Sequence, residues 1–205
     1  MASSIIHIAV AKEINKELNR DNNKLCIGSI APDISKLVGE SKEKSHFLDS
    51  IETNIPNLDK FLQKYKDKLD DDFVMGYYIH LFTDYLWFKY FFTEFCNDDC
   101  ITKLDGTVVK ATENMKVLYI YNDYTDMNIK IIDEYELDLK MFYNELPKID
   151  NIIDEIPMDK LNLIVDQASI IIENSKEKKD MIFNIENVKK FISFSTEIIL
   201  GSIKN

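Results

Sequence analysis

The 205-residue sequence contains a single arginine, Arg20, together with only three histidines and three cysteines. Because guanidinium groups clamp phosphates with paired hydrogen bonds, one arginine argues against a site built on such clamps. The net charge of −11 also excludes the basic surface that non-specific nucleic-acid binding requires, so strong nucleic-acid binding is not expected. Any phosphate would have to be recognised by lysines, backbone amides or a metal ion.

The three cysteines, Cys26, Cys96 and Cys100, form neither an even set nor the paired pattern of a zinc–thiolate site. An odd number of cysteines favours reduced thiols. The first ten residues lack the basic start and the long apolar segment of a signal peptide. Both observations predict a cytoplasmic protein.

Glycine and proline are also scarce, with five and four residues, and no linker, low-complexity segment or internal repeat divides the chain. The alternation typical of β-strands is weak, whereas apolar residues recur with the 3.6-residue period of helices. The length and the 45% hydrophobic content suit one domain with a sizeable core. We therefore predict an all-α fold, a single-domain multi-helix bundle over residues 1–205.

Capping residues and apolar periodicity predict where the helices lie. Helices are expected from residue 4 to about 19, and over 58–66, 71–95, 112–135, 161–174 and 185–203. Residues 40–44 and 96–106 are expected to be loops, and a short helix is expected to open at residues 45–47. The helices after residue 112 carry apolar stripes and few polar groups that could converge, so we interpret them as scaffold. The expected N-caps are Ser3 or Ser4, Asn57, Asp159 and Asn184.

The segment from Asp71 to about Phe95 is apolar and aromatic on almost every face, which predicts a buried helix. It nevertheless carries His80 and Asp84, which helical spacing puts on one face, one turn apart. Burying an imidazole and a carboxylate is costly unless something pairs with them. Three alternatives would account for this pair: a hydrogen bond between the two side chains, a transmembrane helix, or a bound metal ion. Charged residues interrupt the apolar run and no second span exists, which argues against a transmembrane segment.

The rest of the histidine inventory favours the metal ion. His7 and His46, like His80, stand in apolar or helix-start surroundings, and Asp33 and Asp84 occupy similar positions. The proline before Asp33 disfavours a helix at that point, so its carboxylate can project from a bend in the chain. Imidazoles combined with one or two carboxylates are the ligand set that zinc or iron(II) prefers.

The order and context of these residues resemble the zinc-dependent phospholipase C family, which is grouped with the single-strand-specific fungal and plant nucleases. The resemblance covers about the first 90 residues and implies an all-helical, phospholipase C/nuclease-like fold with its metal site in residues 1–95. Its matching positions are an early histidine, a Pro-Asp, a Ser-His, and a histidine and an aspartate four apart, here His7, Asp33, His46, His80 and Asp84.

The resemblance also implies roles for these residues. Asp33, His46, His80 and Asp84 would hold one zinc ion, and His7 would hold a neighbouring ion that Asp84 bridges to the first. The family hydrolyses phosphodiesters or phosphomonoesters with a metal-bound hydroxide, and the aspartate matching Asp33 has been proposed as the catalytic proton acceptor. We therefore expect one or two ions, of zinc or alternatively iron or manganese, and a small phosphoester substrate. Tyr78 and Thr83 are expected to support the ligands from behind.

Two features of the family are missing. The family places a tryptophan main-chain amine on one zinc ion, whereas here removal of Met1 would expose the Ala2 amine, which can reach the site only if the first residues fold back. No histidine follows His80, so the family's remaining zinc site is absent in its usual form. The nearest substitutes on a predicted helix are Asn122, Asp123 and Asp126.

A non-catalytic helical protein with a structural metal site is the alternative to an enzyme. In that case, the absence of the family's remaining zinc ligands would mean that the catalytic activity has been lost. A structural zinc site is closed, whereas a catalytic ion keeps a position open toward a cleft. An HD-type phosphohydrolase would need an adjacent His-Asp pair, and no histidine of this chain is followed by aspartate.

Overall fold

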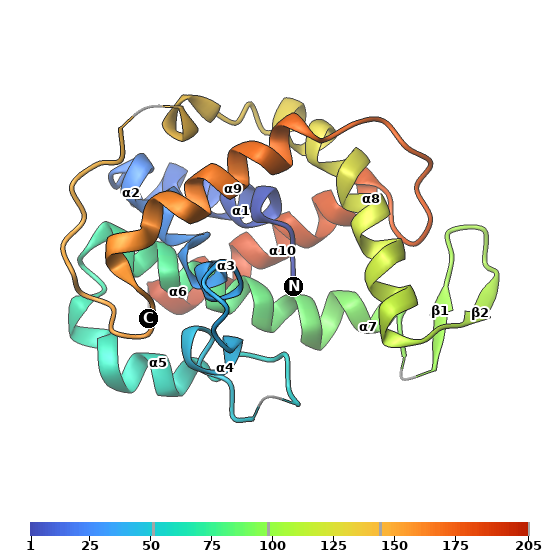
Figure 1. The fold of residues 1–205 in the computed structure, drawn as a ribbon, viewed down its shortest axis with the longest axis horizontal. Coiled ribbons are helices and arrows are strands. Elements are labelled where there is room, and N and C mark those ends of the chain that lie inside the picture. Colours follow the sequence, from blue (N-terminus) through green and yellow to red (C-terminus); the bar gives the residue numbers. More distant parts are fainter. Residues whose placement is uncertain (51, 98, 144, 205) are drawn as a thin grey trace.

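A computed structural model describes residues 1–50, 52–97, 99–143 and 145–204 of the chain. The described part is mostly helical, as predicted, with one small antiparallel hairpin (Figure 1). The α-helices are α1 (Ser4–Leu18), α2 (Asn22–Gly28), α3 (Ile34–Leu37), α4 (Lys42–Ser45), α5 (Leu58–Tyr65), α6 (Asp72–Leu86), α7 (Phe92–Phe95), α8 (Glu113–Glu134), α9 (Leu161–Glu173) and α10 (Ile185–Ile203). The other elements are the 3-10 turns η1 (Ala31–Asp33), η2 (Lys66–Lys68), η4 (Leu139–Phe142) and η5 (Met158–Lys160), the π-helical turn η3 (Trp87–Phe91), and strands β1 (Cys100–Thr102) and β2 (Val108–Lys110).

Side-chain caps set where most of the long helices begin. The Ser3 hydroxyl accepts the amide of Ile6 at the start of α1, and Asn57 and Asn184 cap α5 and α10 in the same way. Each cap satisfies a main-chain N–H that has no partner inside the helix. These three predicted starts are confirmed. Asp159, in contrast, lies in η5 and does not cap α9, which begins without a side-chain cap.

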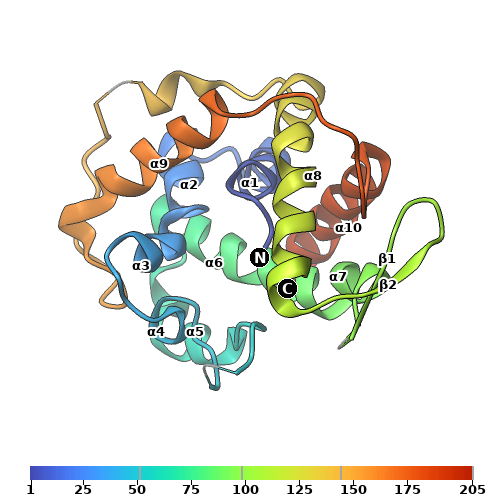
Figure 2. The same ribbon diagram turned by 45° about the vertical axis from the view of Figure 1, so that its right-hand side comes forward.

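Helix α6 runs through the middle of the molecule, and α1, α2, α5 and α10 pack around it (Figures 1 and 2). The backbones of α2 and α6 touch at Gly28 and Gly76. A Cβ at Gly28 would lie 2.2 Å from the Phe73 carbonyl oxygen, and one at Gly76 would lie 2.1 Å from the Leu25 carbonyl oxygen. Because no side chain fits there, glycine is required at both positions. This contact brings the end of α2 against the polar face of α6.

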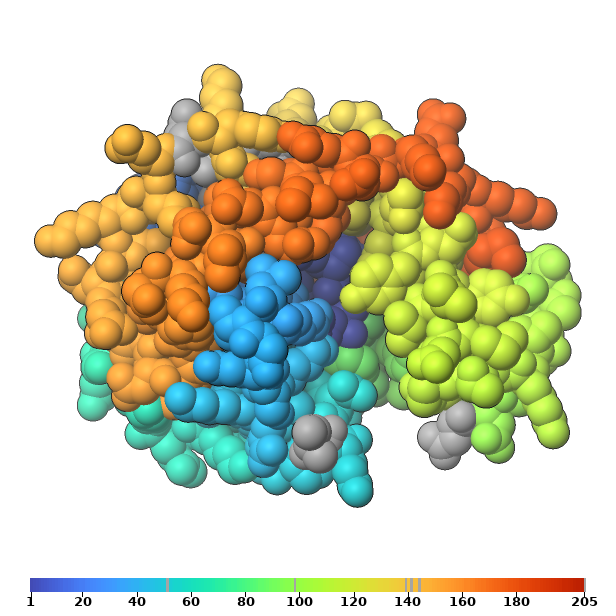
Figure 3. Space-filling model, in the orientation of Figure 1, coloured from blue at the N-terminus to red at the C-terminus, as the bar shows by residue number. Residues whose placement is uncertain are grey.

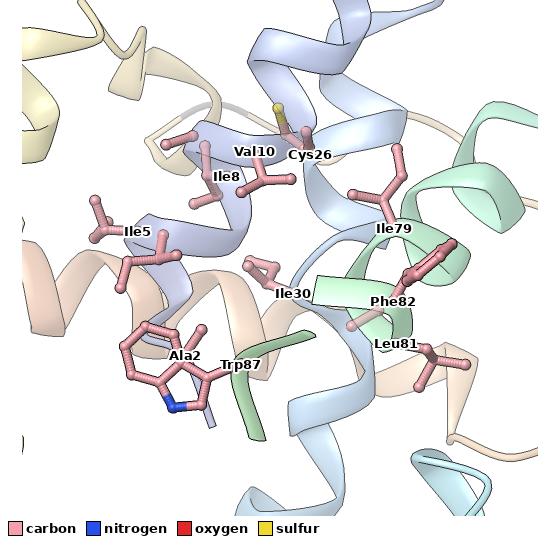
Figure 4. Packing of buried hydrophobic residues seen from close by; sticks show 14 of the residues in the cluster. Ala2, Ile5, Ile8, Val10, Cys26, Ile30, Ile79, Leu81, Phe82 and Trp87 are labelled. Atoms are coloured by element: carbon pink, nitrogen blue, oxygen red, sulfur yellow. The ribbon is translucent and has the colours of Figure 1, made fainter. Parts of the chain in front are cut away.

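One connected cluster of buried apolar side chains extends from Ala2 to Ile199 in α10, and Figure 4 shows part of it. Trp87 in η3 is fully buried. Its ring meets those of Phe183 and Phe191 edge-on, at centroid distances of 5.8 and 5.0 Å. These contacts fasten the end of the central helix to the C-terminal part of the chain.

Three local predictions were wrong. Residues 100–110 form the β1–β2 hairpin, with Cys100 opposite Lys110, where a loop was expected. Residues 42–45 form α4 because the Ser41 hydroxyl accepts the amide of Glu43 and starts a helical turn. The expected helix opening at residues 45–47 is therefore the end of α4, and His46 is its C-cap.

The central helical segment reaches Phe95, as predicted, but not as one regular α-helix. It passes from α6 through the π-helical turn η3 into α7. Turns of π-helix inside α-helices are rare and are often found next to functional sites. None of the helices in the described segments combines the length and the apolarity that a membrane crossing requires.

Candidate metal centre

The structure brings the five predicted ligands together at one buried point. His7 comes from α1, Asp33 from the end of η1, His46 from the end of α4, and both His80 and Asp84 from α6. None of the five is more than 7% exposed. Four separate segments of the chain therefore supply the side chains of one cluster.

The donor atoms form two overlapping groups that could each hold a metal ion. Within each group, one atom per residue lies within 4.8 Å of the others. His46 Nε2 lies 3.4 Å from Asp33 Oδ1 and 3.3 Å from His80 Nε2. His7 Nε2 lies 3.4 Å from Asp84 Oδ1, and Asp84 Oδ2 lies 3.7 Å from His80 Nε2. The groups are His7, His80 and Asp84, and Asp33, His46 and His80.

Several donor atoms of this cluster have no hydrogen-bond partner in the described part of the chain. They are both ring nitrogens of His7, Asp33 Oδ1 and Asp84 Oδ2. A buried polar atom without a partner costs free energy. A cation in each group would supply a partner to one ring nitrogen of His7 and to both carboxylate oxygens, and nitrogen and oxygen donors in this combination suit zinc or iron(II). The residues present therefore fit a metal ion.

Hydrogen bonds from behind orient two of the imidazoles. His80 Nδ1 lies 2.8 Å from the Ser29 carbonyl oxygen, which can only accept, so Nδ1 carries the proton and Nε2 presents a lone pair to the cluster. His46 Nδ1 lies 2.9 Å from Ser45 Oγ, and the Tyr77 hydroxyl donates to the Ser45 carbonyl oxygen. Partners of this kind fix the direction of metal-ligating histidines.

Tyr78 and Thr83, which were expected to support the ligands, make no hydrogen bond to them in the described part of the chain. The Tyr78 hydroxyl lies 3.4 Å from Ser202 Oγ in α10, and Thr83 Oγ1 has no hydrogen-bond partner among the described residues. Only a weak sequence signal pointed to the residues that do contact the imidazoles of His46 and His80. Ser45 directly precedes a candidate ligand, whereas the Ser29 carbonyl contributes through the main chain and leaves no side-chain pattern.

The electrostatics keep these groups in the state that ligates a cation. Burial raises the pKa of Asp33, but Lys36 and His46 outweigh it, and the pKa falls well below its usual range. The pKa of Asp84 is also lowered, because contacts with neighbouring imidazoles outweigh burial. Burial lowers the pKa values of His46 and His80. At neutral pH, both carboxylates are therefore ionised, and these two imidazoles are neutral.

The first residues fold back onto the cluster. The Ala2 amide donates to Asp84 Oδ1 at 3.1 Å, and the Tyr124 hydroxyl of α8 donates to the Met1 carbonyl oxygen. The first residues therefore do fold back, as is required for the main chain at Ala2 to reach the ligands. A role of the Ala2 amine as a ligand stays a prediction.

A cavity of about 510 Å³ lies directly beside the cluster. Asp33 and Ala2 line its inner end, and α8 and α9 form its sides. Figure 3 shows the hollow, with the N-terminal residues (dark blue) at its floor between α8 (yellow-green), α9 (orange) and the segment that contains α3 (blue). Since Asp33 belongs to both the cluster and the cavity wall, a molecule in the cavity can approach the cluster from that side.

We compared the chain with protein-family models, curated proteins and solved structures. No match was found in any of the three comparisons. The cluster therefore has to be interpreted from its own geometry. That geometry supports a buried histidine–aspartate centre that could hold a metal ion next to a cavity.

The substitutes considered for the family's third zinc site have other partners. Asn122 donates to the Lys179 carbonyl oxygen at 3.0 Å. Asp123 accepts the amides of residues 181–183, and Asp126 accepts the amide of residue 178 and pairs with Lys130. These side chains fasten the segment before α10 to α8, and they belong to neither of the groups that could hold a metal.

Proposed function

We propose that this chain is a metal-dependent phosphoester hydrolase. The observation that carries the proposal is the buried set of nitrogen and oxygen donors with unpartnered atoms, one of which, Asp33, also lines a cavity. A set of buried donors that opens toward a cavity on one side is typical of catalytic rather than structural metal sites. The non-catalytic alternative would be expected to enclose its ion on every side.

The resemblance to the zinc-dependent phospholipase C family supports the same proposal. Its five characteristic residues, in the same order along the chain, converge in a mostly helical molecule. We infer a phospholipase C/nuclease-like arrangement of the first 95 residues from this combination. We also infer a cytoplasmic location. The three cysteines are free thiols, which agrees with this inference.

Each residue of the centre has a distinct part in this proposal. Asp33, His46, His80 and Asp84 would hold one ion, and His7 with the second oxygen of Asp84 would hold another. When bound, a divalent zinc, iron or manganese ion supplies a Lewis acid for a phosphoryl oxygen and lowers the pKa of a water molecule. Asp33, ionised and facing the cavity, can accept the proton of the attacking water.

Small phosphoesters are better candidates for the substrate than nucleic acids. The chain carries a net charge of −11 and one arginine, so it repels long polyanions away from the centre. A small phosphoester can be neutralised locally by the metal and the lysines nearby. Its size also suits a cavity of about 510 Å³.

The proposal is tested by metal analysis followed by an activity panel. Protein purified without chelator is expected to carry about one, and at most two, zinc or iron ions per chain. The panel contains small phosphomonoesters and phosphodiesters, phospholipid head-group analogues and single-stranded DNA, each with added zinc, manganese or iron. Asp33→Asn should lower turnover by about 100-fold or more while it retains part of the metal.

Glu155→Gln is the matched control, because Glu155 is a buried carboxylate that pairs with Lys64 and Tyr65 and contributes to neither metal group. Less than about a tenth of an equivalent of metal under metal-replete conditions would contradict the metal centre. A fully metallated protein that hydrolyses no member of the panel would favour the structural alternative. Fastest cleavage of single-stranded DNA would contradict the charge argument alone.

A further inference from the structure

Two lysine ammonium groups line the cavity beside Asp33. Lys36 comes from α3, and its Nζ lies 3.3 Å from Asp33 Oδ1. Lys42 is the first residue of α4, and its Nζ contacts the thioether sulfur of Met1. A thioether is a weak acceptor. Among the described residues, no carboxylate lies within ion-pair distance of Lys42, so its charge is poorly compensated.

The surroundings of Lys42 also disfavour its charged form. Burial, followed by the neighbouring ammonium of Lys36, lowers the pKa of Lys42 to about 8. The side chain is still mostly charged at neutral pH. An anion in the cavity would therefore gain a strong partner and relieve this destabilisation at the same time.

The charge balance of the cavity indicates how much negative charge the occupant carries. With one divalent ion in the centre, the carboxylates of Asp33 and Asp84 balance its charge, and a second ion would add to the positive surplus. A further lysine in the cavity, Lys116, pairs with Glu113. The ammonium groups of Lys36 and Lys42 are left over. A phosphomonoester carries nearly two negative charges at neutral pH, whereas a simple phosphodiester carries one. The surplus matches the phosphomonoester.

Apolar side chains make up a large part of the remaining cavity wall, although polar residues such as Asn128, Gln167 and Asn174 also line it. The apolar lining residues include Phe88, Phe92 and Ile120, and also Ile164 and Ile171 of α9. The cavity extends well beyond what one phosphoryl group would fill. Pockets that combine an apolar wall with a few convergent charged groups bind ligands that have an apolar body and a polar end.

We propose that Lys42, together with Lys36, determines specificity for phosphomonoesters of apolar alcohols over singly charged phosphodiesters. This inference rests on the hydrolase function proposed above. Hydrolysis adds water across the P–O ester bond, breaks the bond to the alcohol, and releases the alcohol and inorganic phosphate. Inorganic phosphate therefore keeps the anionic group that the two lysines bind, and it reports on them without any turnover.

The first test measures binding of inorganic phosphate to the zinc-loaded protein by isothermal titration calorimetry. Lys42→Met should weaken phosphate binding by about tenfold or more, because it removes one poorly solvated charge partner. Lys42→Gln serves as a second variant of similar length, and zinc content checks that each variant is folded. Lys44→Met, at an exposed lysine of the same helix, should leave the affinity within about twofold. Unchanged phosphate affinity in Lys42→Met and Lys42→Gln would overturn the inference.

The second test compares p-nitrophenyl phosphate with methyl p-nitrophenyl phosphate, which share a leaving group but differ by one charge. Lys42→Met should lower kcat/KM by about tenfold for the monoester and by no more than about twofold for the diester. Equal losses for both substrates would overturn the inference. Octyl phosphate should compete at least tenfold better than methyl phosphate because of the apolar wall. If no ester is hydrolysed but phosphate binding still depends on Lys42, the hydrolase function fails and the anion site stands.

Discussion

The buried carboxylates of Asp123 and Asp84 are satisfied in different ways. Asp123 accepts three main-chain amides, those of residues 181–183, at 2.7 to 3.2 Å. Asp84 accepts one amide, from Ala2, and otherwise faces imidazoles, and its Oδ2 has no hydrogen-bond partner in the described part of the chain. A carboxylate of the first kind is saturated and structural. A carboxylate of the second kind still has capacity for a cation.

Asp180 provides a prediction about pH and stability at the residue scale. Burial, followed by the contact with Asp126, raises the pKa of Asp180 to about 6. A raised pKa means that folding favours the protonated form, so this favourable contribution is present below the unfolded-state pKa of about 4 and is lost as the pH rises through about 6. Asp180→Asn mimics the protonated form. It should stabilise the protein by about 1 kcal/mol at pH 8 and by almost nothing at pH 4.

Urea denaturation of both proteins at the two pH values measures this difference. Asp133→Asn, at an exposed aspartate of α8, is the control for the same substitution away from the contact with Asp126. A loss of stability in Asp180→Asn at pH 8 would show that the ion pair with Lys130, rather than the contact between carboxyl groups, decides the effect. An equal benefit at pH 4 and pH 8 would also contradict the prediction.

At the scale of whole elements, the contact between α2 and α6 helps to position the candidate metal centre. The two backbones touch through Gly28 and Gly76, and Ser29, the next residue after α2, holds His80 through its carbonyl oxygen. Separation of the helices would therefore move a metal ligand as well as the core. The tight packing of this pair therefore fixes the orientation of His80 within the candidate metal centre.

Gly76→Ala should accordingly be strongly destabilising. Its new methyl group would lie 2.1 Å from the Leu25 carbonyl oxygen, which is main chain and cannot rotate away. We expect a loss of about 3 kcal/mol in the free energy of unfolding, measured by chemical denaturation, together with weaker zinc binding. Gly201→Ala in α10 is the control, because a Cβ at that position would have nothing within 4 Å of it and alanine favours a helix. Equal stabilities of the two variants would contradict the close contact between the helices.

At the scale of the whole molecule, the centre joins segments from α1, η1, α4 and α6. An ion bound there stabilises the folded state by mass action, by about 4 kcal/mol when free metal is a thousandfold above the dissociation constant. Chelation should therefore lower the Tm by about 10 °C, and added zinc should restore it. Differential scanning calorimetry measures the shift.

The His80→Ala variant links this shift to the centre. His80 belongs to both groups that could hold a metal, so its removal should abolish most of the response to chelator. The variant is expected to have a lower Tm even without chelator, because it loses a buried side chain. The quantity to compare between the two proteins is therefore the change in Tm that the chelator causes. A full response to chelator in His80→Ala would place the metal elsewhere.

Much of the fold and the ligand set could be predicted because their signals are local. Ser3, Asn57 and Asn184 cap helices through amides two or three residues away, and the 3.6-residue period of the apolar positions marks each long helix. His80 and Asp84 share a face for the same reason. Their burial followed from the apolar residues on either side, since a helix without a polar face has to be covered.

The tertiary structure alone decided what depends on distant segments. The hydrogen bond from Tyr77 of α6 to the Ser45 carbonyl oxygen, next to His46 at the end of α4, joins residues 32 positions apart in the chain. The same holds for the Ser29 carbonyl behind His80 and for the cavity between α8 and α9. Lys42, which lines that cavity, contacts Met1 because the first residues fold back onto the cluster. Contacts between residues far apart in the chain leave no periodic or capping pattern, so they could be identified only once the segments were packed together.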